Sequence, residues 1–178
     1  MQILFVHGAG GWVDDQPIIA GLRRRCGLSV TAERYPDDDM SAVAWRGRLA
    51  RQLRATGPTT ILVGHSFGAS MALLHVADGS PDVLPAGLVL LAMPDWSPEG
   101  WEVPEYAVPA GARPPTGLPI RLHHCRDDDV VPVEHLDLHL RHAPQAHARR
   151  HATGGHQLDG RIAAVADDVM TLATQREE

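Results

Sequence analysis

The segment Gly64–Gly68 reads Gly-His-Ser-Phe-Gly, a G-x-S-x-G pattern with Ser66 at its centre. The short apolar run Thr59–Val63 precedes it and the helix-forming run Ala69–Ala77 follows it directly. Between a strand and a helix, this pattern places the serine on a tight, strained turn that lifts its hydroxyl clear of the sheet. A side chain at either glycine would meet the neighbouring strand or helix. The sequence therefore predicts that Ser66 is a nucleophile, the alternative being a plain glycine-rich turn.

A serine hydroxyl is a weak nucleophile and needs a histidine base, which a carboxylate orients. After such a turn the acid and then the histidine follow along the chain. The predicted strand Leu118–His124 runs into a turn with three successive aspartates at 127–129, and the predicted strand Ala146–His151 leads through two glycines to His156. These loops are expected at the carboxyl edge of a parallel sheet, where open α/β sheets bind ligands.

A glycine-rich segment near the start of the chain completes this set. The predicted strand Met1–Val6 is followed by His7–Gly11, which reads His-Gly-Ala-Gly-Gly. Acyl transfer needs amide donors for the developing oxyanion, and the expected pair is the amides of Ala9 and Phe67. A phosphate-binding loop is the alternative. The segment lacks the G-x-G-x-x-G spacing, and the chain has no lysine for a Walker motif.

Together these motifs resemble those of the α/β-hydrolase superfamily. The short chain is similar to the compact retinoblastoma-binding serine hydrolase type. The resemblance rests on His7-Gly8, on the G-x-S-x-G segment, on Asp128 in an Asp-x-x-Val-Pro motif, and on Gly155-His156. These motifs are spread over most of the chain and are specific for the fold and the catalytic set, but not for the substrate.

The resemblance implies a catalytic triad of Ser66, Asp128 and His156. Among the three aspartates, the family spacing back from Pro132 selects Asp128, and Asp127 and Asp129 are expected to face solvent or to cap the next helix. The chain departs from the family at Cys125, where relatives commonly have a glycine ahead of the acid. This departure leaves the choice among the aspartates open.

Strands and helices alternate along the whole sequence, which implies a doubly wound, mostly parallel six-stranded sheet with helices on both faces. The length of 178 residues fits a single domain, 1–178. The resemblance gives the strand order 2-1-3-4-5-6. The remaining predicted strands are Leu28–Glu33 and Ala86–Leu91, and the remaining predicted helices are Pro17–Arg25, Ser41–Thr56, Glu134–His142 and Ile162–Thr174.

The segment Pro94–Pro119 breaks this alternation. It holds seven of the 14 prolines, which rules out a regular helix along its length. Larger relatives insert a helical cap here, so the resemblance implies a minimal fold with a vestigial flap and no full cap. Trp12, Met93 and Trp96 follow strand ends and are the candidate walls of an acyl pocket. The alternative is that the tryptophans seal the rim of the core and the segment is a surface loop.

Composition limits the partners. The 16 basic residues, all arginine, are outnumbered by 22 acidic ones, which argues against nucleic acid. No apolar run is long enough to cross a membrane, and the two cysteines fit reduced thiols, so a cytoplasmic location is expected. His135, His139 and His142 have a spacing that could bind zinc, but they lack further ligands and are expected to face solvent. No metal or cofactor is expected.

The predicted function is that of a serine hydrolase, which cleaves a small carboxylic ester or thioester through an acyl-enzyme on Ser66. An acyltransferase with the same triad is one alternative. A non-catalytic binding protein on the same fold is the other, because a fold does not fix a function. Nothing in the sequence indicates an oligomeric state.

Overall fold

Six parallel strands form one sheet in the order β2-β1-β3-β4-β5-β6, which confirms the predicted order. A computed structural model describes residues 1–77 and 81–175, and within them every strand pairing is parallel, where the sequence indicated a mostly parallel sheet. The strands are β1 Gln2–Val6, β2 Val30–Ala32, β3 Thr60–His65, β4 Gly87–Leu91, β5 Ile120–Cys125 and β6 His147–His151.

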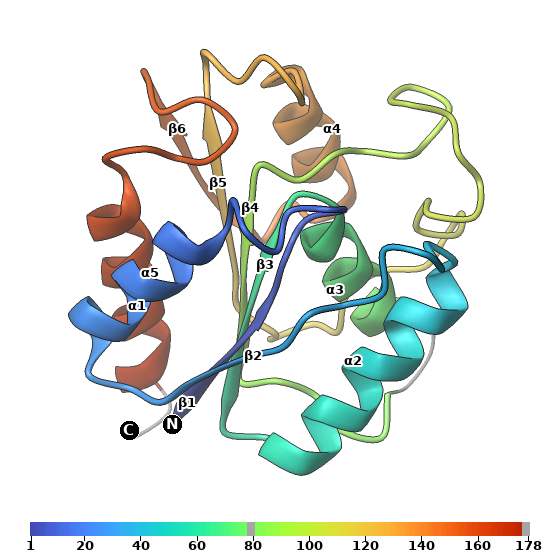
Figure 1. Cartoon of the computed structure of the whole chain (residues 1–178). Helices are drawn as coiled ribbons and strands as arrows, with labels where there is room; N and C mark the ends of the chain where they lie inside the picture. The colour runs from blue at the N-terminus through green and yellow to red at the C-terminus, as the bar shows by residue number, and fades with distance from the viewer. Residues whose placement is uncertain (78–80, 176–178) are drawn as a thin grey trace.

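Helices cover both faces of the sheet (Figure 1). They are α1 Gln16–Cys26, α2 Ala42–Thr56, α3 Phe67–Ala77, α4 Glu134–His142 and α5 Ile162–Thr174. Helices α1 and α5 pack on one face, and α2, α3 and α4 lie on the other. Successive side chains of a strand point to opposite faces. Ile3 and Phe5 therefore belong to the core under α1 and α5, whereas Leu4 and Val6 belong to the core under α2, α3 and α4.

Local signals set the ends of α1 and α2, which lie within about one residue of the predicted bounds. Ser41 caps α2, since its Oγ accepts a hydrogen bond from the amide of Ala44 at 3.2 Å. Helix α1 ends at Gly27, whose φ of 63° is the left-handed conformation that glycine adopts without strain. The second strand is shorter than predicted, at Val30–Ala32. It is an edge strand that pairs with β1 alone and is only partly buried.

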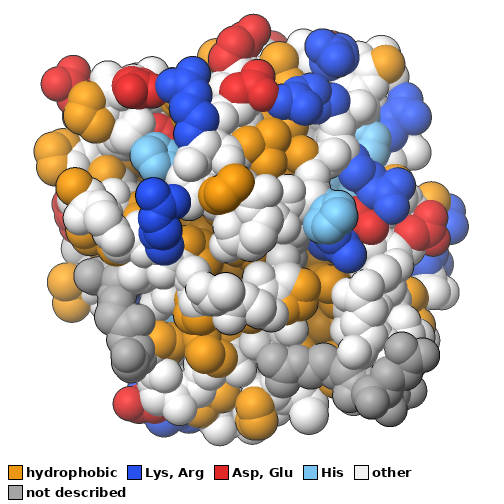
Figure 2. All heavy atoms as spheres, turned by 180° about the vertical axis from the view of Figure 1, so that it is seen from behind, with side chains coloured by type: hydrophobic (Ala, Val, Ile, Leu, Met, Phe, Trp, Pro, Cys, Tyr) orange, Lys and Arg blue, Asp and Glu red, His pale blue; other side chains and the backbone are white. Residues whose placement is uncertain are grey.

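All strands end at the same edge, shown at the top of Figure 1. The loops that leave this edge carry Ser66, Asp128 and His156. Residues 94–119 contain no helix or strand, in keeping with their prolines, and lie on the side of the sheet that carries α3 (Figure 1). No helix in the described part of the chain is long and apolar enough to cross a membrane. Arginine and acidic side chains intermingle on the face that Figure 2 shows.

The histidines of α4 do not all face solvent, which corrects the expectation for two of them. His135 and His139 are buried, and only His142 is exposed. His135 Nδ1 accepts a hydrogen bond from the amide of Asp95 at 2.8 Å, and His139 Nε2 donates one to the carbonyl of Met93 at 3.1 Å. They therefore fix the chain as it leaves β4. The described residues contain no cluster of three or more His, Cys, Asp or Glu side chains suited to a metal ion.

Burial gives His139 a measurable effect on acid stability. Burial lowers the pKa of His139 to about 4, whereas the unfolded chain has the ordinary value of 6.5. The unfolded state therefore binds the proton more tightly, so this contribution to stability is complete above pH 6.5 and is lost as the pH falls towards 4. Between pH 7 and pH 4.5 we expect the free energy of unfolding in urea to fall by about 1–3 kcal/mol less in His139→Gln than in the wild type.

The matched control is His142→Gln, on the exposed side of the same helix, which should keep the wild-type pH dependence. Equal pH dependence in the wild type and His139→Gln would contradict this assignment.

Candidate active site

Ser66 has the backbone conformation of a strained strand-to-helix turn. Its φ is 51°, and its amide donates to the carbonyl of Leu91 at 2.8 Å. The two glycines are required by close packing. A Cβ at Gly64 would lie 2.6 Å from Cα of Ala69, and a Cβ at Gly68 would overlap the carbonyl oxygens at the end of β1. The turn leaves Ser66 partly exposed above a buried strand.

Asp128 and His156 meet at this edge. The carboxylate oxygens of Asp128 lie 3.1 and 3.0 Å from Nδ1 of His156. Oδ1 of Asp128 also accepts from the amides of Val130 and Val131, each at 2.9 Å, and Oδ2 lies 3.2 Å from Nε2 of His124. Burial acts to raise the pKa of Asp128, but the hydrogen bonds from His124, His156 and Val131 outweigh it and hold that pKa well below its usual range.

The two neighbouring aspartates are exposed, as expected, but neither caps a helix. Asp127 accepts hydrogen bonds from the amides of Gly154 and Gly155, at 3.2 and 2.9 Å, and so holds the loop that carries His156. Asp129 is exposed at the mouth of the cleft. Of these three aspartates, Asp128 is the one whose carboxylate contacts the imidazole of His156.

The amides of the glycine-rich loop after β1 differ in their partners. The amides of Gly8, Gly10 and Gly11 donate to Asp15, to Asp37 and to the carbonyl of Gly8. In the described chain, no acceptor is found for the amide of Ala9, nor for that of Phe67 at the first turn of α3. These are the two amides that the sequence assigned to an oxyanion.

These groups line a cleft of about 830 Å³. Its walls include Ala9, Ser66, Phe67, His156 and Trp96. Among the described residues the Ser66 hydroxyl has no hydrogen-bond partner. In free enzymes the bond between nucleophile and base often tightens only when substrate is bound.

The structure separates the three candidate wall residues. Trp12 does not line the cleft, because it packs edge-on against His7 and beside the core under α1. Met93 lines a second cavity of about 440 Å³ under the flap instead. Trp96 lines both spaces and forms a wall between them.

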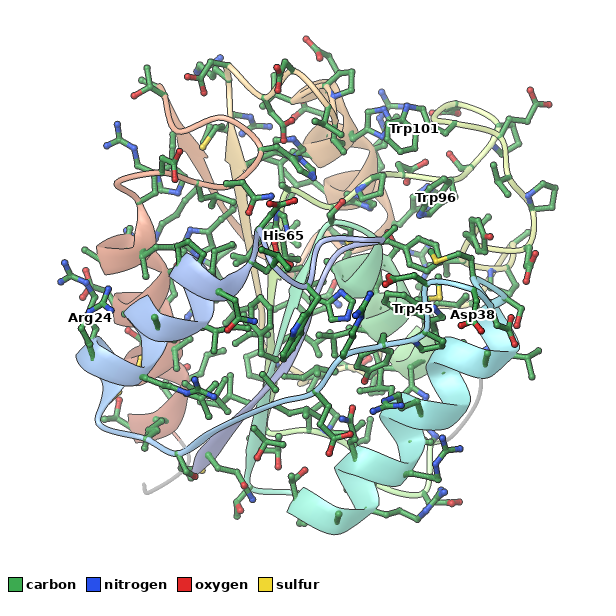
Figure 3. The ribbon with its side chains drawn as sticks, viewed as in Figure 1. Arg24, Asp38, Trp45, His65, Trp96 and Trp101 are labelled. Atoms are coloured by element: carbon green, nitrogen blue, oxygen red, sulfur yellow. The ribbon has the colours of Figure 1, made fainter. Side chains whose placement is uncertain are left out.

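Trp96 is held firmly in that position. Its Nε1 donates to Oγ of Ser70 at 2.8 Å, and its ring packs edge-to-face against Phe67, Tyr106 and Trp101, with centroids 6.0, 5.0 and 5.0 Å away. Figure 3 shows Trp96 and Trp101 close together on the flap segment. Trp96 and Tyr106 of the flap therefore pack directly against Phe67, the residue that follows Ser66.

Two buried residues of this region were missed from the sequence. Asp15 occupies the N-cap position of α1, but its side chain turns away from the helix and binds the amide of Gly8 and His65. His124 supports Asp128 from the end of β5. The only signal at His124 was a polar side chain near a strand end, and the only signal at Asp15 was its place before a helix; many residues of this chain share these features.

Comparison with known proteins identifies the family and the fold. The profile of the Alpha/beta hydrolase family matches residues 3–174. No curated protein matches the sequence significantly. A provisionally assigned hydrolase from Agrobacterium vitis has a TM-score of 0.77 at 17% identity, over 97% of this chain and 87% of that one.

Two further solved structures are similar. The mouse alpha/beta hydrolase domain-containing protein 10 has a TM-score of 0.75 at 16% identity, over 98% of this chain and 90% of that one. Est1E from Butyrivibrio proteoclasticus, with ferulic acid bound, has a TM-score of 0.73 at 15% identity, over 99% of this chain and 89% of that one. At these identities the likeness concerns the fold.

Proposed function

Because this chain belongs to the alpha/beta hydrolase family, we propose that it is a serine hydrolase that cleaves a small carboxylic ester or thioester through an acyl-enzyme. The observation that carries the proposal is one cleft in which Ser66, on a strained turn, shares the walls with His156, whose Nδ1 contacts the buried Asp128. The short length of the chain also supports a likeness to the retinoblastoma-binding serine hydrolase type.

Each group has a role in this reaction. Asp128 accepts from Nδ1–H of His156, which leaves Nε2 as the base that takes the proton of Ser66. Ser66 attacks the carbonyl carbon, and the amides of Ala9 and Phe67 bind the oxyanion. The protonated His156 then gives its proton to the departing alcohol or thiol. Water activated by His156 releases the carboxylic acid and frees Ser66.

The substrate class follows from the same cleft. The amides of Ala9 and Phe67 suit a carboxylic ester or thioester carbonyl, and ferulic acid, the ligand of the similar Est1E structure, is a carboxylic acid. We propose that the protein acts in the cytoplasm. The proposed reaction requires no metal, cofactor, nucleic acid or membrane.

Pre-steady-state kinetics test the proposal. With 4-nitrophenyl acetate, an activated ester that acylates a serine quickly, we expect a burst of nitrophenol that matches the enzyme concentration, followed by slower turnover, because deacylation is then the slower step. The covalent route would be refuted by two observations together: turnover without a burst of nitrophenol, and no acyl-enzyme in intact-protein mass spectra after acid quench. Transfer of the acyl group to an added alcohol or amine in preference to water would favour the acyltransferase alternative.

We propose that the acyl site accepts short or slender groups. The 94–119 segment forms no helical cap, and Trp96 closes the cleft on the side of the second cavity. An acyl chain that enters from Ser66 would therefore meet the indole. Each methylene that the pocket accommodates contributes up to about 0.8 kcal/mol, so activity should rise with chain length and then break at the wall.

The Trp96→Ala variant should move that break to longer chains, because truncation joins the cleft to the 440 Å³ cavity beside it. The measurement is kcat/KM for nitrophenyl esters of increasing acyl length. Trp101→Ala is the control, since Trp101 lines the cleft but not the second cavity. If activity broke at the same acyl length in Trp96→Ala as in the wild type, Trp96 would not be the wall of the acyl site. A steady rise through long chains in the wild type would indicate a lipase-like site.

A further inference from the structure

Besides Asp128 and His156, a second aspartate–histidine pair is buried close to the proposed triad without being part of it. The pair is Asp15, which follows the glycine-rich loop, and His65, which precedes Ser66. Their side chains are 0% and 1% exposed. Figure 3 places His65 at the upper edge of the sheet, beside the loop that leads into α1. The reaction described above uses neither side chain.

The contacts of this pair connect three loops of the active site in series. Oδ2 of Asp15 accepts from the amide of Gly8 at 2.9 Å, in the loop that presents Ala9. Oδ1 of Asp15 lies 2.8 Å from Nδ1 of His65, an ion-pair contact that is too bent for a good hydrogen bond. On the other side of the ring, Nε2 of His65 lies 2.9 Å from the carbonyl oxygen of His156.

This geometry indicates the protonated form of His65. Both ring nitrogens face oxygen atoms that can only accept a hydrogen bond, namely those of a carboxylate and a carbonyl. A neutral imidazole has one N–H and would leave a lone pair facing an oxygen, whereas an imidazolium presents an N–H and positive charge on both sides. Burial acts to lower the pKa of His65, but Asp15 and the carbonyl of His156 outweigh it and raise that pKa above its usual range.

We propose that the Asp15–His65 ion pair is a positioning element, which holds the oxyanion amide of Ala9 and the base His156 in register across Ser66. This proposal rests on the proposed serine hydrolase function. Asp15 fixes the loop of Ala9 through Gly8, and His65 fixes the backbone of His156 itself. The rings of His65 and His156 also lie 4.8 Å apart, so a shift of one moves the other.

A merely structural ion pair would have a different signature. Buried pairs often do little for net stability, and removal of one partner destabilises the protein. A structural role therefore predicts a lower melting temperature with unchanged kcat in the molecules that stay folded. A positioning role predicts a lower kcat with a nearly unchanged KM, because binding of the ground-state ester does not require the aligned amide and imidazole.

The substitutions follow the two sides of the ring. Asp15→Asn removes the charge, His65→Asn keeps an amide near the Nδ1 position, and His65→Gln keeps one near Nε2, where it can still donate to the carbonyl of His156. The matched control is Asp37→Asn. Asp37 also accepts a hydrogen bond from the glycine-rich loop, from the amide of Gly10 at 3.2 Å. Unlike Asp15, it is exposed and is not paired with His65.

In the full-length protein we expect Asp15→Asn and His65→Asn to lower kcat by about 10–100-fold, as sub-ångström misplacement of reacting groups does, with KM changed by less than about three-fold. His65→Gln should recover part of the loss, and Asp37→Asn should stay within about two-fold of the wild type. Wild-type kcat in folded Asp15→Asn and His65→Asn would overturn the positioning role, as would a loss confined to KM.

A second readout does not depend on activity. Proton–nitrogen NMR of the histidine side chains in the wild type should show both ring nitrogens of His65 protonated at pH 7. A neutral His65 ring would overturn the ion pair even if the variants lose activity or fail to fold. A wild type that hydrolyses no ester would instead remove the proposed function, and the positioning role with it, so the two failures are distinct.

Discussion

The Ser66→Ala protein is expected to lose ester hydrolysis almost entirely, with kcat lowered by about 10⁴–10⁶-fold. The acyl-enzyme cannot form without the hydroxyl, and the residual rate then comes from the oxyanion amides and from substrate binding alone. The fold should persist, because Ser66 is partly exposed and its hydroxyl has no hydrogen-bond partner in the described part of the chain. The measurement is steady-state hydrolysis of 4-nitrophenyl acetate, with circular dichroism as the check on folding.

The control for this substitution is Ser29→Ala, at an exposed serine before β2 that is remote from the cleft. It should hydrolyse the ester at the wild-type rate. If purified Ser66→Ala kept an activity within about ten-fold of the wild type, the hydrolysis would arise from another group and the assignment of Ser66 would be wrong.

The second large effect is expected at Asp128. The Asp128→Asn variant should lower kcat by about 10³–10⁴-fold, because an amide that donates towards Nδ1 favours the wrong tautomer of His156 and provides no charge to stabilise the imidazolium. The effect should fall mainly on kcat, since Asp128 is buried and is not part of the cleft wall.

The neighbouring aspartates provide a graded control. Asp129→Asn should stay near the wild-type rate, as Asp129 is exposed and the carboxylate bonded to His156 is that of Asp128. Asp127→Asn should cause a modest loss, because one of its two contacts to the loop of His156 needs an acceptor oxygen that the amide nitrogen cannot replace. If Asp128→Asn kept its activity and Asp127→Asn or Asp129→Asn lost most of it, the assignment of Asp128 as the acid would be wrong.

The fold and the turn at Ser66 could be predicted because their signals are local. The glycines at 64 and 68 are dictated by atoms within a few residues or on the adjacent strand, and buried parallel strands leave continuous apolar runs such as Ile61–Val63. The predicted strand order needed the family resemblance as well. Pairing of strands that are distant in the chain is not contained in the composition of any one segment.

The sequence did not reveal what the polar core residues do. His135 and His139 have the spacing of an exposed helix face, yet they are buried against the carbonyl and amide groups that follow β4. Asp15 looks like an ordinary N-cap until the fold brings His65 to within 2.8 Å of it. Trp12 follows a strand end as an acyl-pocket wall would, but it packs against His7 instead. In each case a contact between distant segments decides the role.

We infer that Ser66 is an activated nucleophile. Its most direct test is the reaction of the intact protein with a fluorophosphonate, followed by mass spectrometry of the whole chain and of its peptides. The triad predicts one adduct per chain, located on Ser66, absent in Ser66→Ala and strongly slowed in His156→Ala. An adduct on another residue would contradict the assignment of Ser66, and the absence of any adduct would favour a non-catalytic binding protein on the same fold.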